Sequence, residues 1–320
     1  MLTRHFVHPC AGTDAVRRSA GPNPKSMVNA TKVLVEARNR PRAASRVLLA
    51  VAALVATGLI GCRVPTEAPS RGAGARTKTQ GKVLIVTGED YPGHKWQRTE
   101  AVLRRQLIAD SRLTVDVVRD LTQLASADLR AYDAVVLHFK NYDPAVPGRD
   151  GYDNLTRFVR AGGGLVLVHF ACGAFQEYKQ EFETLAGRVW NPKFRGHDRY
   201  GRFRVEILET DHAVTRGMTS FETTDELYTC LEGTTPVTVL ADARSNVDGK
   251  RHPMAFVLRY GAGRVFHSPL GHDVRALAVP AVGALFRRGC AWAAGLDPAA
   301  QPGSTIRKTI DPTAGKDRIR

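Results

Sequence analysis

The chain has 320 residues, of which 43% are hydrophobic, a composition that fits a globular protein and excludes a disordered one. Its net charge of +15 would suit a nucleic-acid-binding protein, but the excess charge lies at the two ends. Residues 1–80 carry +10 and residues 299–320 carry +3, which leaves +2 for residues 81–298. A nearly neutral central region lacks the basic surface that binds phosphate backbones, so nucleic acid is not an expected partner.

Residues 47–61 form an uncharged apolar segment that follows four arginines. Its 15 residues are too few for a transmembrane helix, which needs about 20, and they suit the core of a signal peptide. The segment ends in a Leu-Ile-Gly-Cys sequence that resembles a bacterial lipobox, in which Cys62 would carry the lipid. We therefore expect residues 1–62 to be a lipoprotein signal peptide, with Met27 as an alternative start. The mature protein is expected to be exported and membrane-anchored in the cell envelope. The other interpretations are a short membrane anchor or a cysteine that stands there by chance.

The sequence after Cys62 divides into a tether, one domain and a tail. Residues 63–80 are polar and contain proline, as in a flexible tether, and residues 299–320 predict a disordered basic tail. Residues 81–298 are left as a single folded domain. It contains Cys172, Cys230 and Cys290, and export would permit a disulfide such as Cys230–Cys290. Three pairings are open at this stage.

The first half of the domain predicts alternating strands and helices. Continuous apolar or alternating runs predict strands at residues 82–87, 113–118, 132–138 and 165–169. Apolar residues at helical spacing predict helices over residues 96–108 and 152–160, the second ending at three glycines. This order indicates a parallel sheet covered by helices.

The second half is richer in strands. We expect strands at residues 202–208, 236–240, 254–258 and 263–268, the last two joined as a hairpin. A closing helix is predicted from Val274 to about Ala294. The domain should therefore be an α/β fold whose C-terminal part is mainly β.

Histidines and carboxylates follow several of these strands. Ligands of open α/β sheets bind beyond the carboxyl ends of the strands, so groups at those ends are expected to meet. Candidates after the strands are Gly88, Glu89, Asp90, His94, Trp96, His138, Lys140, His169, Cys172, His267, His272 and Asp273. Several imidazoles from separate segments predict a metal site or an acid–base site, although some can equally bond buried backbone.

Six motifs in order resemble the ThuA-like (trehalose utilisation) branch of the class I glutamine amidotransferase-like fold. They cover about residues 81–295. Ala213 replaces the usual proline of the third motif, and Phe256 stands where tryptophan is common. The motifs are His94-x-Trp96-x-x-Thr99, Gly162-Gly163-Gly164 with His169, Asp211-His212-Ala213-Val214-Thr215-x-Gly217, Asp225-Glu226-Leu227-Tyr228, His252-Pro253, and Tyr260-Gly261-Ala262-Gly263 with Leu270-Gly271-His272-Asp273.

The resemblance implies a flavodoxin-like three-layer sandwich with a mainly parallel central sheet. It also raises the question of a nucleophile, because class I amidotransferases place a cysteine in a tight strand-to-helix elbow. Cys172 follows the fourth strand but lacks the preceding glycine of that elbow. A buried or disulfide-bonded Cys172 is therefore the better expectation.

The candidate site residues have the following expected roles. Glu226 is the candidate general base, because a carboxylate beside an aromatic ring can be desolvated, and Asp225 is expected to orient it or to cap a helix. His169 and His272 are candidate metal ligands or proton carriers, with Asp273 orienting His272.

Three residues are expected to bind substrate: His94, Trp96 and Tyr228. The ring of Trp96 offers a flat face to a sugar. The cofactor expected at this site is a divalent metal.

Three functions are compatible with the sequence. The first is an enzyme of carbohydrate utilisation that acts on a keto-sugar or glycoside by acid–base, metal-assisted chemistry. The second is a non-catalytic sugar-binding domain of the envelope, and the third is an amidotransferase-like hydrolase that uses Cys172. The expected partners are a sugar-derived small molecule and a membrane reached through the lipid anchor.

Overall fold

The computed structural model describes residues 78–89, 93–141, 143 and 146–299. The predicted leader, most of the tether and all but the first residue of the predicted tail lie outside the described residues. Within the described part, no helix is both long and apolar enough to cross a membrane.

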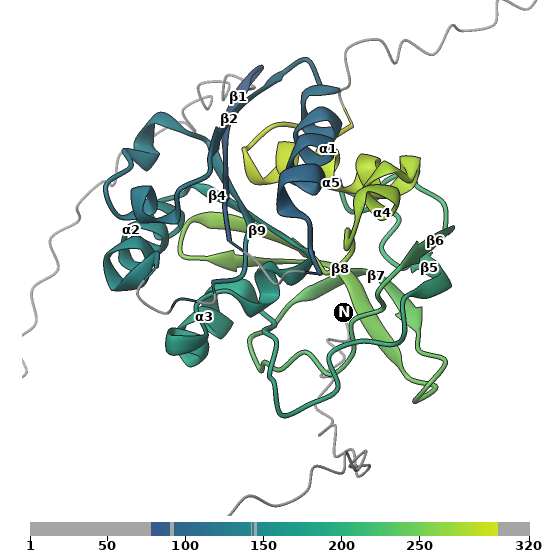
Figure 1. The fold of residues 1–320 in the computed structure, drawn as a ribbon. Coiled ribbons are helices and arrows are strands. Elements are labelled where there is room, and N and C mark those ends of the chain that lie inside the picture. The colour runs from purple at the N-terminus through teal and green to yellow at the C-terminus, as the bar shows by residue number, and fades with distance from the viewer. Residues whose placement is uncertain (1–77, 90–92, 142, 144–145, 300–320) are drawn as a thin grey trace, which may run out of the picture. The chain divides into compact units, whose positions relative to one another are not determined.

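One sheet forms the middle layer of the domain (Figure 1). Its strand order is β2-β1-β3-β4-β9-β8-β7-β5-β6. The first five strands in this order are parallel, and the remaining pairs are antiparallel. The strands are β1 (Gly81–Thr87), β2 (Leu113–Val118), β3 (Ala134–His138), β4 (Gly164–Val168), β5 (Gly201–Ile207), β6 (Phe221–Asp225), β7 (Thr238–Arg244), β8 (Arg251–Tyr260) and β9 (Gly263–Ser268).

Helices cover both faces of the parallel half (Figure 1). One face carries α1 (Trp96–Ile108), α4 (Val274–Ala278) and α5 (Pro280–Ala293), and the other carries α2 (Gly148–Arg160) and α3 (Lys179–Ala186). Short 3-10 turns complete the chain at η1 (Leu121–Ala125), η2 (Leu129–Ala131), η3 (His169–Gly173) and η4 (Gln176–Tyr178).

The alternation of side chains along β1 divides the core in two. Val83 and Ile85 point to the α1–α5 face, and Leu84 and Val86 point to the α2–α3 face. A strand buried on both faces must be apolar at every position, which is why β1 is a continuous apolar run. The flavodoxin-like three-layer sandwich with a β-rich C-terminal part is confirmed.

Most predicted elements are observed, with two differences at helix ends. α2 begins at Gly148, four residues before the prediction. The prediction of a single closing helix is wrong. The segment forms two helices, α4 and α5, separated at Val279, whose backbone is extended at ψ 122°. Pro280 causes the break, because proline disfavours helical backbone at the preceding residue and is itself suited to a helix start.

The glycine run before β4 is required by close packing. A Cβ on Gly164 would lie 2.4 Å from the carbonyl oxygen of Ala293 at the end of α5. Any larger residue there would push β4 away from α5. Glycine at this position therefore allows β4 to pack closely against α5. His169 follows directly after this strand.

Candidate metal centre

One edge of the sheet gathers most of the candidate residues. β1, β3, β4 and β9 are parallel and point their carboxyl ends to this edge, where His94, His138, His169 and His272 follow them. The antiparallel strand β6 ends at the same edge, since Asp225 pairs with Gly201 at the start of β5. The sheet thus brings together groups that are more than a hundred residues apart.

His169 occupies a sharp turn at the end of β4. It has φ +50°, a left-handed backbone that non-glycine residues rarely adopt, and its side chain is completely buried. Strained backbone of this kind persists at functional sites because the surrounding structure holds it. The elbow of the fold therefore presents an imidazole, and the cysteine discussed above lies three residues further on.

Four side chains of this edge converge. His94, His169, Glu226 and His272 each offer one ligand atom, and these atoms all lie within 4.8 Å of one another. Glu226 Oε2 is 3.4 Å from His169 Nε2 and 3.1 Å from His272 Nδ1, and the two nitrogens are 3.3 Å apart. The ring of His94 stacks on Phe170 with centroids 4.6 Å apart, which holds it beside the other two imidazoles. We call these four residues the cluster.

The hydrogen bond of His169 to backbone fixes its tautomer and leaves its Nε2 an acceptor. His169 Nδ1 is 2.7 Å from the carbonyl oxygen of Pro269, and because a carbonyl only accepts, Nδ1 carries the hydrogen. Nε2 then presents a lone pair to the carboxylate of Glu226. Two acceptors that face each other in a buried site need a proton or a cation between them.

The cluster fits a first-row divalent cation. Three imidazoles and one carboxylate are the donors that zinc and its neighbours take. Each ligand atom lies about 2.0–2.2 Å from a bound cation, so two ligand atoms on opposite sides of it are at most about 4.4 Å apart. The ligand atoms of the cluster lie within 4.8 Å of one another, so they would have to move together by only a few tenths of an ångström. Metal ligation is compatible with the predicted roles of His169 and His272, and the structure adds His94 and Glu226 to their group.

The protonation of the cluster follows from burial and from Glu226. Burial, together with the nearby His272, lowers the pKa of His94 to about 4, and burial also lowers the pKa of His169. Burial alone would raise the pKa of Glu226, but its contacts with His169 and His272 hold that pKa below its usual range. Burial alone would lower the pKa of His272, but Glu226 raises it. His94 and His169 are thus neutral near pH 7, as metal ligands must be.

The two aspartates beside the cluster have different places. Asp225 is fully buried and accepts hydrogen bonds from the backbone N–H groups of Glu226, Gly271 and His272 at 2.8, 2.7 and 3.1 Å. It thus orients the cluster and caps no helix. Asp273 instead caps α4 through the N–H of Ala276 at 2.8 Å and accepts from the hydroxyl of Tyr200 at 3.1 Å. Asp273 follows His272 in the chain, and its carboxylate bonds Ala276, Tyr200 and Arg275.

The expected substrate-binding residues and other candidates are spread more widely. The ring of Tyr228 lies 4.9 Å from that of His169, at the cluster. Trp96 begins α1 and is half-buried. His138 is completely buried, with Nδ1 2.9 Å from Thr87 Oγ1, and packs on Phe170. His267 is buried on the α3 side, where Nδ1 donates to the carbonyl oxygen of Ala186, so it lies outside the cluster.

The sequence analysis missed His197. Its Nε2 lies 3.5 Å from Glu226 Oε1, the carboxylate oxygen on the far side from His169, and its side chain is 38% exposed. His197 lies on the loop before β5, which pairs with Tyr228 through an isolated bridge. No periodic pattern marks this loop, and only its histidine could have signalled a role.

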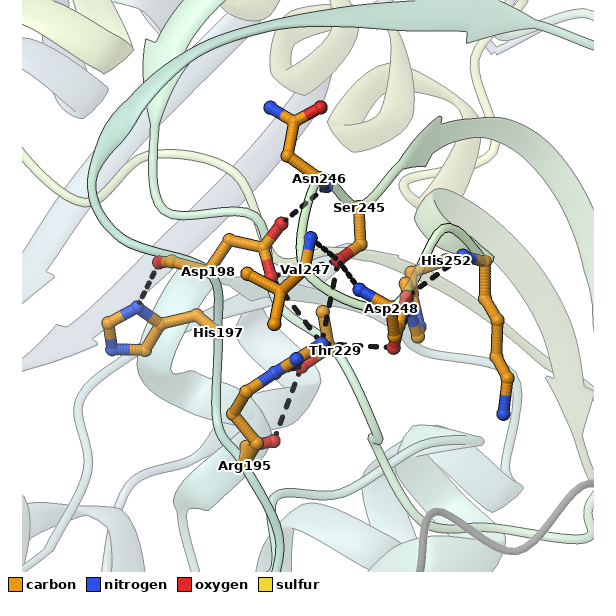
Figure 2. Close-up of polar contacts among 10 residues, drawn as sticks. Arg195, His197, Asp198, Thr229, Ser245, Asn246, Val247, Asp248 and His252 are labelled. Atoms are coloured by element: carbon orange, nitrogen blue, oxygen red, sulfur yellow. Dashed lines mark hydrogen bonds and ion pairs between the residues drawn. The ribbon is translucent and has the colours of Figure 1, made fainter. Parts of the chain in front are cut away.

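A polar network holds the His197 loop in place (Figure 2). Asp198 accepts hydrogen bonds from Ser245 Oγ at 2.9 Å and from the N–H of Asn246 at 3.0 Å. Asp248 accepts from Arg195 at 2.9 Å and contacts His252 Nε2 at 3.0 Å. Figure 2 shows the ring of His197 at one end of this network, where its Nδ1 donates to the backbone carbonyl oxygen of Asp198 at 2.7 Å. We call Arg195, Asp198, Ser245, Asp248 and His252 the brace.

The cysteines do not form the expected disulfide. Cys172 and Cys290 are both completely buried thiols outside any disulfide, so none of the three pairings occurs within the described residues. Cys290 lies in α5 against the core face of the sheet, where burial raises its pKa to about 12. The buried position of Cys172 in η3 disfavours a nucleophile, which needs contact with substrate.

The structure also has a cavity that lies away from the cluster. It measures about 980 Å³ and is lined by residues at the amino ends of the parallel strands, including Asp133, Gly163 and Arg264. Two of its cations bond the end of α5: Lys78 Nζ donates to the carbonyl oxygen of Ala294 and Arg264 to that of Trp292, at 2.9 and 3.0 Å. Lys78 and Arg264 therefore have a structural role at the end of α5.

Comparisons with known proteins identify the family of this chain. The family profile of ThuA, described as trehalose utilisation, matches residues 82–293. The chain belongs to the ThuA family. A ThuA-like protein from Parabacteroides merdae has 25% sequence identity and a TM-score of 0.60, with 70% of this chain and 94% of that chain covered. A ThuA-like protein from Bacteroides uniformis has 14% identity and a TM-score of 0.54, covering 72% and 99%.

Weaker structural matches include a glutamine amidotransferase from Thermotoga maritima, at 13% identity and a TM-score of 0.38, covering 59% of this chain and 75% of that one. A comparison with curated proteins finds no match.

The ThuA motifs fall into two groups in the structure. His94, His169, Glu226 and His272 come from four motifs and form the cluster. The Asp211–Gly217 motif is a turn instead, in which His212 Nδ1 accepts from the N–H of Val214 and the ring packs on Trp292. His252 belongs to the brace. The ThuA signature thus combines cluster residues with residues that support the fold.

Proposed function

We propose that this ThuA protein is a metal-dependent enzyme of carbohydrate utilisation that acts on a keto-sugar or a glycoside. One observation carries the proposal: four ligand atoms from separate elements converge within 4.8 Å at the ligand-binding edge of the sheet. His169 Nε2 lies 3.4 Å from Glu226 Oε2 and 3.3 Å from His272 Nδ1, so three of these groups face one another directly.

Different residues of the chain would bind the cation, accept a proton and close one side of the site. His94, His169, His272 and Glu226 Oε2 would hold the cation, which when bound polarises a sugar carbonyl or hydroxyl and lowers the pKa of a coordinated water. Glu226 Oε1 faces the half-exposed His197 and is the oxygen placed to take a proton from a bound sugar. The ring of Tyr228 closes one side of the site.

The metal content of the purified protein tests this proposal. We expect about one divalent ion per chain, lost in His169→Ala and in His94→Ala. The matched control is His212→Ala, since His212 is a half-buried histidine outside the cluster. Turnover is then screened with keto-sugars and glycosides in the presence of the metal found. A wild-type protein that takes up none of Zn²⁺, Mn²⁺, Fe²⁺, Co²⁺ or Ni²⁺ sinks the proposal.

We also propose that the domain works outside the cytoplasm, anchored through lipid on Cys62. The apolar segment before Cys62 and the Leu-Ile-Gly-Cys sequence support this placement. Cell fractionation of the wild type and Cys62→Ala tests it. The wild type is expected in the membrane fraction and the variant outside it, and equal partition of the two would rule out lipidation of Cys62.

A further inference from the structure

The cavity at the amino ends of the parallel strands lies at the opposite edge of the sheet from the cluster. Its volume of about 980 Å³ is near the upper end of the range of about 300–1,000 Å³ that is usual for ligand sites. Asp133, Gly163 and Arg264 line it and lie at the starts of β3, β4 and β9. We call it the basic cavity. Its charged lining residues are Lys78, Asp128, Arg130, Asp133, Arg157, Arg259 and Arg264.

The cations of the basic cavity outnumber its carboxylates by five to two. Each carboxylate is paired with one cation of the lining, as Lys78–Asp133 and as Arg130–Asp128. Within the part of the chain that the structure describes, the other three cations form no ion pair with a carboxylate; they are Arg157, Arg259 and Arg264. The lining therefore carries three positive charges that its own carboxylates do not balance.

These three arginines come from separate elements. Arg259 on β8 and Arg264 on β9 are direct partners in the sheet, and burial, together with the nearby Arg259, lowers the pKa of Arg264. Arg157 lies in the last turn of α2 and, like Arg259, is exposed. Arg264 is bonded to the end of α5, whereas Arg157 and Arg259 are left to face a ligand. An anion in the basic cavity would relieve the repulsion among these like charges.

The charge of the whole chain indicates where this anion comes from. Without Lys78, the lining of the basic cavity carries +2, which equals the net charge of all of residues 81–298. The excess charge of the domain is therefore gathered at this one place. The chain's own ends do not supply the anion, because residues 1–80 carry +10 and residues 299–320 carry +3. The charge of the basic cavity is complementary to an acidic molecule from outside the chain.

The tether enters the domain at the basic cavity, since Lys78 lines it. Only residues 63–77 separate Lys78 from Cys62. Fifteen residues span at most about 50 Å, because a fully extended chain advances about 3.3–3.6 Å per residue. A lipid on Cys62 would thus keep the basic cavity within about 50 Å of a bilayer. Anionic headgroups at the surface of that bilayer attract basic groups.

We propose that the basic cavity binds the phosphate of anionic membrane lipids through Arg157, Arg259 and Arg264. The planar guanidinium group matches the geometry of a phosphate and can bind it through two parallel hydrogen bonds. The inference rests on the proposed anchoring through Cys62, which brings the basic cavity to the membrane. Bound in this way, the domain turns the amino ends of its parallel strands toward the bilayer. The cluster, at the opposite edge of the sheet, then faces away from the membrane.

Vesicle binding of the full-length Cys62→Ala chain tests the inference, because this variant cannot carry lipid on residue 62. The probes are vesicles of phosphatidylglycerol mixed with phosphatidylcholine, and vesicles of phosphatidylcholine alone. We expect R157Q/R259Q in this background to weaken binding to the anionic vesicles by about tenfold or more, since each arginine near an anionic surface contributes about a fivefold gain. Binding to phosphatidylcholine alone should be the same with and without this change.

Amide exchange in the same samples locates the contact. The anionic vesicles are expected to slow exchange in residues 157–163 and 259–264 of the Cys62→Ala chain, and to slow it less in R157Q/R259Q. The basic leader is identical in the two proteins, so a difference between them reports the basic cavity. If the vesicles bind without slowing exchange in these segments, the inference is overturned.

The matched control is R104Q/R105Q, which removes two exposed arginines of α1 outside the basic cavity. It changes the net charge by the same amount and should keep the affinity of the parent chain. An equal loss of affinity in the two double variants would mean that overall charge alone binds the vesicles, and it overturns the inference. Inorganic phosphate that slows exchange in residues 157–163 and 259–264 as much as the vesicles do overturns the assignment to lipid.

The fractionation of wild type and Cys62→Ala described above separates this inference from the proposed anchor. If the wild type is lipidated but R157Q/R259Q binds the anionic vesicles as the parent chain does, the anchor stands and the lipid site is wrong. If the wild type is not lipidated and the affinity still depends on Arg157 and Arg259, the lipid site stands and the anchor is wrong.

Discussion

Asp225 links two distant parts of the cluster through a single carboxylate. Its oxygens accept the N–H groups of Glu226, Gly271 and His272, so one buried side chain fixes the backbone beside two cluster residues. Burial raises its pKa, yet three N–H donors surround it and favour the charged form. Asp225 therefore acts through Glu226 and His272 and is a positioning residue.

Replacing Asp225 with asparagine should weaken metal binding without emptying the site. The amide group of asparagine would turn N–H groups toward one of the backbone donors, which leaves that donor unsatisfied and lets the loop of His272 shift. We expect metal affinity to fall by about 10- to 100-fold, measured by competition with a chromophoric chelator. Asp120→Asn is the control, because Asp120 is an exposed cap of η1. Unchanged affinity in Asp225→Asn would show that the loop is held by other contacts.

At the scale of elements, segments with a strong apolar pattern were predictable from the sequence, and segments without one were not. α1 and β9 were predicted with the bounds observed, because each has a long apolar pattern between clear breaks. The missed elements, α3 and β6, have eight and five residues. β6 pairs only with β5 within the described residues and carries three exposed or half-buried side chains, so its sequence lacks a strong apolar signal.

The residues of the brace hold the loop that carries His197 beside the cluster. The brace joins the loop before β5 to the turn between β7 and β8, and neither segment has regular structure of its own. Contacts of this kind depend on how two loops meet in three dimensions. The sequence could suggest His94, His169, Glu226 and His272 through strand ends and motifs, but it could not show that His197 reaches Glu226.

Removing Asp198 should release this loop. Asp198→Ala takes away the acceptor of Ser245 Oγ and of the N–H of Asn246, and it leaves these donors to water. Amide exchange in residues 191–199 is expected to speed up about tenfold or more, while exchange in β1 and β4 stays slow. Mass spectrometry of exchanged peptides measures it, with Asp128→Ala, an exposed cap of η2, as the control. If exchange of the loop is unaltered, the brace does not hold it.

For the whole molecule, the apolar cores and the polar groups of the candidate site lie in different places. The parallel strands and their helices bury two apolar cores, and the polar groups of the cluster and brace collect beyond one edge of the sheet. The alternation of strands and helices made the layers predictable from the sequence. The antiparallel order β8-β7-β5-β6 was not, since it depends on loops that lead β5 and β6 past β7.

The stability of the whole domain should depend on the burial of His267. This histidine is completely buried, its Nδ1 donates to the carbonyl oxygen of Ala186 at 2.9 Å, and burial lowers its pKa to about 4. The unfolded chain takes up a proton on this residue below its ordinary pKa of 6.5, whereas the folded protein does not until about pH 4. The unfolded state therefore binds more protons in this window, and stability falls as the pH falls from 6.5 to about 4.

His267→Asn isolates this contribution, because asparagine keeps an N–H donor for Ala186 and does not titrate. The free energy of unfolding of the wild type, less that of the variant, is expected to fall by up to about 3 kcal/mol between pH 7 and pH 4. Urea unfolding at a series of pH values measures both proteins, and the contributions of His138 and of the cluster cancel in the difference. A difference that stays constant with pH would mean that His267 titrates alike in the folded and unfolded chains.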